Sequence, residues 1–97
     1  MHIGICHITL RLPENDTLKG KRRVISSLKS RVRSRFNVAI AEVEDNSRWQ
    51  LITLGVSCVS NNAQHANEIL SKVVQYINDI GGDTEFLDYD MEILHGL

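Results

Sequence analysis

Apolar and polar side chains alternate along two segments, one near each end of the chain. Between residues 4 and 12 the even positions Cys6, Ile8, Leu10 and Leu12 are apolar, and between residues 84 and 94 the alternating apolar positions include Leu87, Tyr89, Met91 and Ile93. A period of two residues is typical of a strand with one buried face. Pro13 ends the first predicted strand because proline has no backbone N–H to donate to a sheet.

Two longer segments carry the period of an amphipathic helix instead. Their apolar positions are Leu18, Ile25, Leu28, Val32 and Phe36 within residues 17–36, and Ala63, Ala66, Leu70, Val73, Ile77 and Ile80 in the second segment. Each predicted helix has a suitable N-cap, which is Asp16 or Thr17 for the first and Asn61 or Asn62 for the second. The glycines at positions 81 and 82 favour an end of the second helix there.

Residues 38–43 and 51–59 are rich in Val, Ile, Leu and Ala, and the polar residues 44–48 separate them as in a hairpin. The order strand, helix, strand, strand, helix, strand predicts one α+β domain over residues 1–97. Two right-handed crossovers then give a ferredoxin-like βαββαβ sandwich, a four-stranded antiparallel sheet with both helices on one face. The first and third strands lie in the middle of that sheet, so Cys6 and Cys58 are neighbours in the core.

The composition is that of an ordinary globular protein, with 42% hydrophobic and 24% charged residues in a chain of 97. No apolar run approaches the roughly 20 residues of a membrane-spanning helix. The first residues have neither the cationic region nor the cleavage site of a signal peptide. We therefore expect a cytoplasmic protein without a membrane partner, and two reduced core thiols at Cys6 and Cys58.

The sequence offers no arrangement of residues that predicts catalysis, a metal site or a cofactor. His2 and Cys6 are separated by about 13 Å at roughly 3.3 Å per strand residue, which is too far to share a zinc ion. A phosphate-binding P-loop before the first helix would need glycine at position 15 and serine or threonine at position 22, where Asn15 and Arg22 stand. Acids that alternate in the last strand are typical of a solvated edge. We predict a protein that is not an enzyme.

The charges are segregated along the chain, although the formal net charge is only −1. The first predicted helix carries cations and no acid: Lys19, Lys21, Arg22, Arg23, Lys29, Arg31, Arg33 and Arg35. Residues 79–92 carry acids and no lysine or arginine. Cations in the first turns oppose the helix dipole, and those four residues apart repel each other. Because these unfavourable interactions are all concentrated in one helix, they favour a role for the cations in binding a ligand.

An anionic partner would satisfy these charges, because phosphate groups suit both a helix N-terminus and a row of cations. We predict RNA or a ribosome as the partner. The predicted phosphate contacts are Lys19, Lys21, Arg22, Arg23, Lys29 and Arg33. The alternative is a solvated helix whose charge is balanced elsewhere in the fold or by a partner subunit.

A second functional hypothesis is a homodimeric protein-interaction module that binds no nucleic acid. Ile3 and Ile5 alternate away from the predicted core and would leave apolar surface for self-association on the open sheet face. Trp49, beside Arg48, has the chemistry to stack on an RNA base. The sequence lacks the aromatic cluster of an RNA recognition motif, so packing or an oligomer contact is the favoured role of Trp49.

The order and spacing of several segments resemble the YlxP-like family of small bacterial proteins over nearly the whole chain. The segments are residues 10–13 (LRLP), 18–23 (LKGKRR), 35–43 (RFNVAIAEV), 49–50 (WQ), 54–56 (LGV) and 59–61 (VSN). The chain departs from the family at Gly20, where its lysine-rich segment would have an acid, which makes the helix start more cationic. The resemblance implies a ferredoxin-like fold and no established reaction. Family members are often encoded among translation and ribosome-maturation genes, which by association favours an RNA or ribosomal partner.

Overall fold

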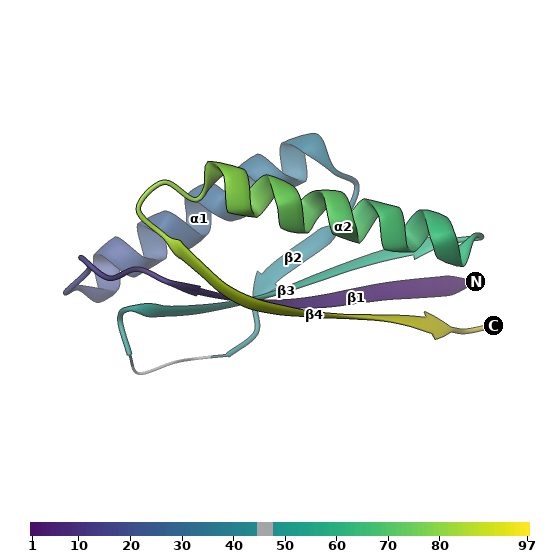
Figure 1. Ribbon diagram of the computed structural model, residues 1–97, viewed down its shortest axis with the longest axis horizontal. Coiled ribbons are helices and arrows are strands. Elements are labelled where there is room, and N and C mark those ends of the chain that lie inside the picture. Colours follow the sequence, from purple (N-terminus) through teal and green to yellow (C-terminus); the bar gives the residue numbers. More distant parts are fainter. Residues whose placement is uncertain (45–47) are drawn as a thin grey trace.

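The computed structural model describes residues 1–44 and 48–97. Its elements follow the predicted order: β1 (His2–Arg11), α1 (Leu18–Arg35), β2 (Ala39–Glu42), β3 (Leu51–Ser60), α2 (Ala63–Ile80) and β4 (Glu85–His95). All strand pairs are antiparallel, in the order β2-β3-β1-β4. Both helices lie on one side of the sheet (Figure 1). The predicted ferredoxin-like fold, with β1 and β3 in the middle, is confirmed.

Side-chain caps decide where the two helices begin. The Thr17 hydroxyl accepts a hydrogen bond from the Gly20 backbone N–H at 3.0 Å, and the Asn62 side-chain oxygen accepts one from the His65 N–H at 3.0 Å. Each bond satisfies a backbone donor that has no partner within its helix. At the other end of α2, Gly82 has a φ of 57°, which glycine adopts without strain. No helix in the described residues is long and apolar enough to cross a bilayer.

The loop before α1 is tied to the loop before β3. The Asn15 side-chain amide donates to the Thr17 carbonyl at 2.7 Å and to the Trp49 carbonyl at 2.8 Å. A Cβ atom at position 20 would overlap the Asn15 side-chain oxygen. A larger residue at position 20 would therefore require the Asn15 side chain to move, which gives a structural reason for the residue that departs from the resembling family.

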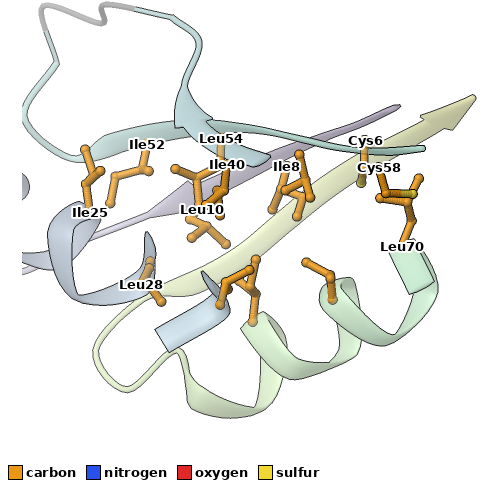
Figure 2. Packing of buried hydrophobic residues seen from close by; sticks show 14 of the residues in the cluster. Cys6, Ile8, Leu10, Ile25, Leu28, Ile40, Ile52, Leu54, Cys58 and Leu70 are labelled. Atoms are coloured by element: carbon orange, nitrogen blue, oxygen red, sulfur yellow. The ribbon is translucent and has the colours of Figure 1, made fainter. Parts of the chain in front are cut away.

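The core fills the space between the sheet and the two helices (Figure 2). Its largest fully buried side chains come from both central strands and both helices: Ile8, Leu10, Ile52, Leu54, Val32, Leu70, Val73 and Ile77. Burying a side chain of this size stabilises the fold by about 1.5–3 kcal/mol relative to leaving it exposed. The apolar faces predicted for β1, β3 and both helices are thus the faces that pack together, except that Leu18, at the start of α1, is 42% exposed.

The last strand differs from its predicted pattern at its beginning. The pairing of β1 with β4 shifts register between Thr9 and Leu10, so that Leu10 lies opposite Phe86. Phe86 packs against the core, whereas Leu87 is 48% exposed. The prediction that Leu87 faces the core is wrong, because an extra residue in one strand moves the side chains before it to the opposite face.

The two chain ends lie beside each other, because β1 and β4 are antiparallel neighbours (Figure 1). The Gly96 backbone N–H donates to the Met1 carbonyl at 2.8 Å, and the Met1 ammonium donates to the Leu97 carbonyl. His2 and His95 stand opposite each other next to these bonds, with their Nδ1 atoms 2.7 Å apart. His95 is thus the last residue of β4.

The prediction of two unpaired core thiols is confirmed. Cys6 and Cys58 are buried and free, on adjacent strands, and they lie close together beside Leu70 (Figure 2). Burial raises the pKa of the Cys6 thiol to about 11, and the negative charge of Asp90 acts in the same direction. Burial also raises the pKa of Cys58, and a hydrogen bond from the Gly4 backbone partly opposes this. Both groups are held as neutral thiols near neutral pH.

A close contact between β1 and α2 generates a stability prediction. A Cβ atom on Gly4 would lie 2.7 Å from Leu70 Cδ1, and Leu70 is fully buried. We expect Gly4→Ala to reduce the free energy of unfolding by about 1–3 kcal/mol through overpacking, and Leu70→Ala to reduce it by about 2–5 kcal/mol through a cavity. In the double variant the new methyl group enters that cavity. Urea unfolding should therefore give a double-variant loss smaller than the sum by about 0.5 kcal/mol or more, and strict additivity would contradict the contact.

The raised thiol pKa generates a reactivity prediction. A thiolate is the nucleophilic form of cysteine, and at about pH 8 a group with the pKa of Cys6 is almost entirely protonated. We expect DTNB to label the native Cys58→Ala variant, which isolates Cys6, on the order of a hundredfold more slowly than the urea-unfolded variant. The native rate should rise with each step in pH up to about 11. Equal rates for native and unfolded protein would show that Cys6 is not shielded.

Candidate functional site

Five of the six predicted phosphate contacts share one side of α1. They are Lys19, Arg22, Arg23, Lys29 and Arg33, and we call this set the basic arc. At about 100° per residue these positions fall within roughly a third of the helix circumference. Burial of Ile25, Leu28 and Val32 on a different side of α1 turns the basic arc toward solvent. Lys29 is half-buried, and the other four members are exposed.

Lys21 does not belong to this surface. Its side chain is only 3% exposed, and its Nζ lies 3.5 Å from Glu42 Oε2 and 3.4 Å from the Arg48 carbonyl oxygen. Position 21 is one helical turn before Ile25 and therefore lies on the core-facing side of α1. The prediction of Lys21 as a phosphate contact is corrected on this ground: its ammonium already serves an internal ion pair. The four-residue spacing between Lys21 and Ile25 could have indicated from the sequence that Lys21 lies on the buried side of α1.

Next to β2 the basic arc borders a hollow of about 310 Å³. The hollow is lined by Arg22, Ile25, Ser26, Lys29, Ser30, Arg33 and Glu42. Arg33 is held over this hollow because its Nη2 donates to the Ile40 carbonyl at 3.2 Å. The arrangement combines three cations and two hydroxyl donors with a single carboxylate, which is a chemistry that accepts phosphate oxygens.

The two serines of this hollow were not among the predicted phosphate contacts. Ser26 and Ser30 follow Arg22 by four and eight residues and so lie on the same side of the helix. A search for hydroxyl residues at helical spacing from the cations would have found both. Their position shows that the basic arc also carries neutral donors.

Most cations of α1 lack a carboxylate partner in the part of the chain that the structure describes. The salt bridges there are His7–Glu44, Arg11–Glu85 and Lys21–Glu42, and none of them involves a member of the basic arc. The first turn of α1 contains no acid that could offset the helix dipole. The positive charge of the arc is therefore not neutralised by these ion pairs.

Arg35 lies on the other flank of α1, outside the basic arc. The Arg35 guanidinium stacks 4.8 Å from the centroid of the Tyr76 ring on α2, a cation–π contact that links the two helices. Trp49 is half exposed, and its carbonyl is bound by Asn15, at the loop that leads into α1. The Trp49 backbone thus lies near the start of α1, and its half-exposed side chain has surface available for packing or stacking.

No metal centre is assembled within the described residues. A group of three or more His, Cys, Asp or Glu side chains close enough to hold an ion does not occur there. The contact between His2 and His95 joins only two imidazoles, in a T-shaped arrangement with ring centroids 4.8 Å apart. This contact was missed in the sequence because the two residues lie at opposite ends of the chain.

The comparisons with known proteins agree with this fold and give no reaction. The family model described as a protein of unknown function, DUF503, matches residues 3–91. An uncharacterized protein of Bacillus subtilis strain 168, YlxP, is 29% identical over 76 residues, which covers 78% of this chain and 83% of YlxP.

Three solved structures share the fold at low sequence identity. The designed protein Foldit4 is 9% identical, with a TM-score of 0.55 and full coverage of both chains. A conserved protein of unknown function from Bacteroides thetaiotaomicron, described as a possible oxidoreductase, is 14% identical, with a TM-score of 0.54 and 95% coverage of each chain. The designed ferredoxin-fold protein LFR1 1 is 12% identical, with a TM-score of 0.52, covering 100% of this chain and 88% of its own. At such identities the likeness concerns the fold alone.

The family match covers all the strands and helices except the ends of β1 and β4. It includes every member of the basic arc and every residue of the hollow beside β2. On the strength of this match and of the similarity to YlxP, the chain belongs to the DUF503 family, that of the YlxP-like proteins.

Proposed function

We propose that this protein is an accessory factor that binds RNA through the basic arc of α1. The observation that supports this most directly is the hollow beside β2, which Arg22, Lys29 and Arg33 line together with two serine hydroxyls. Cations gathered on one surface attract a phosphate backbone and release its counterions on binding. The association of YlxP-like genes with translation genes favours ribosomal RNA as the target.

The length of the basic arc favours a polyanion over a small phosphorylated molecule. Lys19 and Arg33 are the first and last members of the arc, which at about 1.5 Å per residue extends roughly 21 Å along α1. A single phosphate group reaches only the one or two cations beside it, whereas a nucleic-acid strand presents a charge every few ångströms. A backbone that follows the helix would contact all members of the arc at once.

We expect the protein to recognise the phosphate backbone of the RNA rather than the RNA sequence. Arginine, lysine and serine side chains contact phosphates without reading base edges. The exposed Trp49, near the start of α1, offers one surface for stacking on an unpaired base. This combination suits structured RNA with a single-stranded segment next to a helix.

The test is filter binding to a structured RNA over a series of salt concentrations. If the basic arc contacts phosphates, the affinity falls with salt, and each contact contributes about 0.7 to 0.9 to the slope of log K against log salt. The triple variant Arg22→Gln, Lys29→Gln, Arg33→Gln should reduce this slope by about 2 to 3. Salt-independent binding, or an unchanged slope in the triple variant, would refute the proposal.

Two matched controls distinguish binding through the basic arc from binding that depends only on the net charge of the protein. Arg31→Gln removes a cation from the same helix, two residues before Arg33 but on the opposite flank, and should leave the slope within about 0.3 of the wild type. Lys72→Gln removes an exposed cation from α2, outside α1 and the hollow, and should likewise leave the slope unchanged. A loss of slope in either control equal to that of Arg33→Gln alone would mean that binding follows net charge and not the basic arc.

A further inference from the structure

The face of the sheet opposite the helices has a hollow of about 660 Å³. Two rows of side chains cross the four strands there: Ala41, Gly55, His7 and Asp90 in one, and Ala39, Ser57, Ile5 and Glu92 in the other. The residues on β2 and β3 in these rows are all small. The hollow exists because small side chains form its floor, and we call it the trough.

Larger side chains bound the trough on both sides. Val43, just after β2, lies over the floor, since a Cβ atom on Gly55 would be 2.5 Å from Val43 Cγ1. On the other side Ile5 projects from β1 and is 37% exposed. Apolar surface continues beyond the trough along β3, where Val59 is 68% exposed. An apolar patch that extends past a hollow is typical of a site for another macromolecule.

The border of the trough is acidic. Asp90 and Glu92 line it from β4 and Glu44 lines it from the β2 side, and no lysine or arginine is found among its described lining residues. The Glu44 carboxylate lies 3.6 Å from His7 Nε2. The nearest arginine in β1, Arg11, is held by two hydrogen bonds to Glu85. A partner that covered the apolar floor would therefore need to bring its own positive charge.

This charge pattern argues against a second copy of the chain as the occupant. If two trough faces stacked, the carboxylates of Asp90 and Glu92 would be buried against a surface that offers them no lysine or arginine. Burying a carboxylate without a partner is costly. A small molecule fits poorly too, because much of the border is exposed and would leave the ligand half in water.

We propose that the trough binds an amphipathic helix with a cationic flank, supplied by another protein. An α-helix is about 10 Å wide with its side chains, and three strands span roughly the same distance at 4.8 Å per strand. The apolar stripe of such a helix would rest on Ala41, Ser57 and the Val43 side chain that covers Gly55, and its lysines or arginines would reach Asp90 and Glu92. Docking an amphipathic helix in a groove is a recurrent mode of recognition. The site lies on the opposite face of the sheet from the basic arc.

The test uses a synthetic helix of about 18 residues with leucines at positions i, i+3, i+4 and i+7 and lysines at its remaining positions. The backbone amide signals of Ala41, Gly55 and Ser57 in a two-dimensional NMR spectrum report binding at the trough. We expect saturable shifts of these signals. The double variant Asp90→Lys, Glu92→Lys should weaken the fitted Kd by about tenfold or more, through lost attraction and added repulsion.

Controls address charge, shape and self-association. The double variant Glu68→Lys, Asp79→Lys makes the same change in charge on the exposed side of α2 and should leave Kd within about twofold. Ala41→Leu fills the trough without changing charge and should also weaken binding. Equal binding of a scrambled peptide, of a peptide with glutamate in place of lysine, or to Asp90→Lys, Glu92→Lys would overturn the proposal, as would a stable dimer that buries the Gly55 amide.

Discussion

Packing of the apolar stripe of α1 against the sheet fixes the rotation of that helix, and the surface chemistry of the molecule depends on this rotation. Ile25, Leu28 and Val32 are buried, and this fixes the direction in which each of the remaining side chains of α1 points. The basic arc faces water for this reason. Lys21 points inward for the same reason, and Glu42 on β2 supplies the carboxylate that makes its burial tolerable.

The sheet separates two surfaces of opposite character. The helix layer carries the basic arc, and the open face carries an apolar trough with an acidic border. Because the pleat alternates side chains between the two faces, β1 can contribute Ile8 to the core and His7 to the trough in consecutive positions. An anionic partner and a cationic partner could thus be bound at the same time without competing for surface.

Much of the fold could be predicted from the sequence because it follows from local periodicity. The strands and helices were placed to within one or two residues, and the caps at Thr17 and Asn62 were among the named alternatives. The register shift that turns Phe86 inward was not predictable, since a bulge depends on how β4 fits β1 across the sheet. Local alternation carries no information about that fit.

The candidate sites were predicted less completely, for a physical reason. The cations of α1 are adjacent in sequence, so their clustering was visible, but charge alone did not distinguish the buried Lys21 from its neighbours. The trough combines residues of β1, β2, β3 and β4, and its floor consists of alanine, glycine and serine. Small residues on separate strands form no recognisable sequence pattern, and only the strand register shows that they lie side by side.

The hydrogen bonds between Met1 and the last two residues nearly close the backbone into a ring. A short linker could join these ends, and new ends could be opened at the exposed Gly82 turn, which would give a circular permutant of the same topology. In such a rearranged chain β4 would precede β1 and the two would form a hairpin. The order in which strands emerge during synthesis would change while the basic arc and the trough kept their geometry.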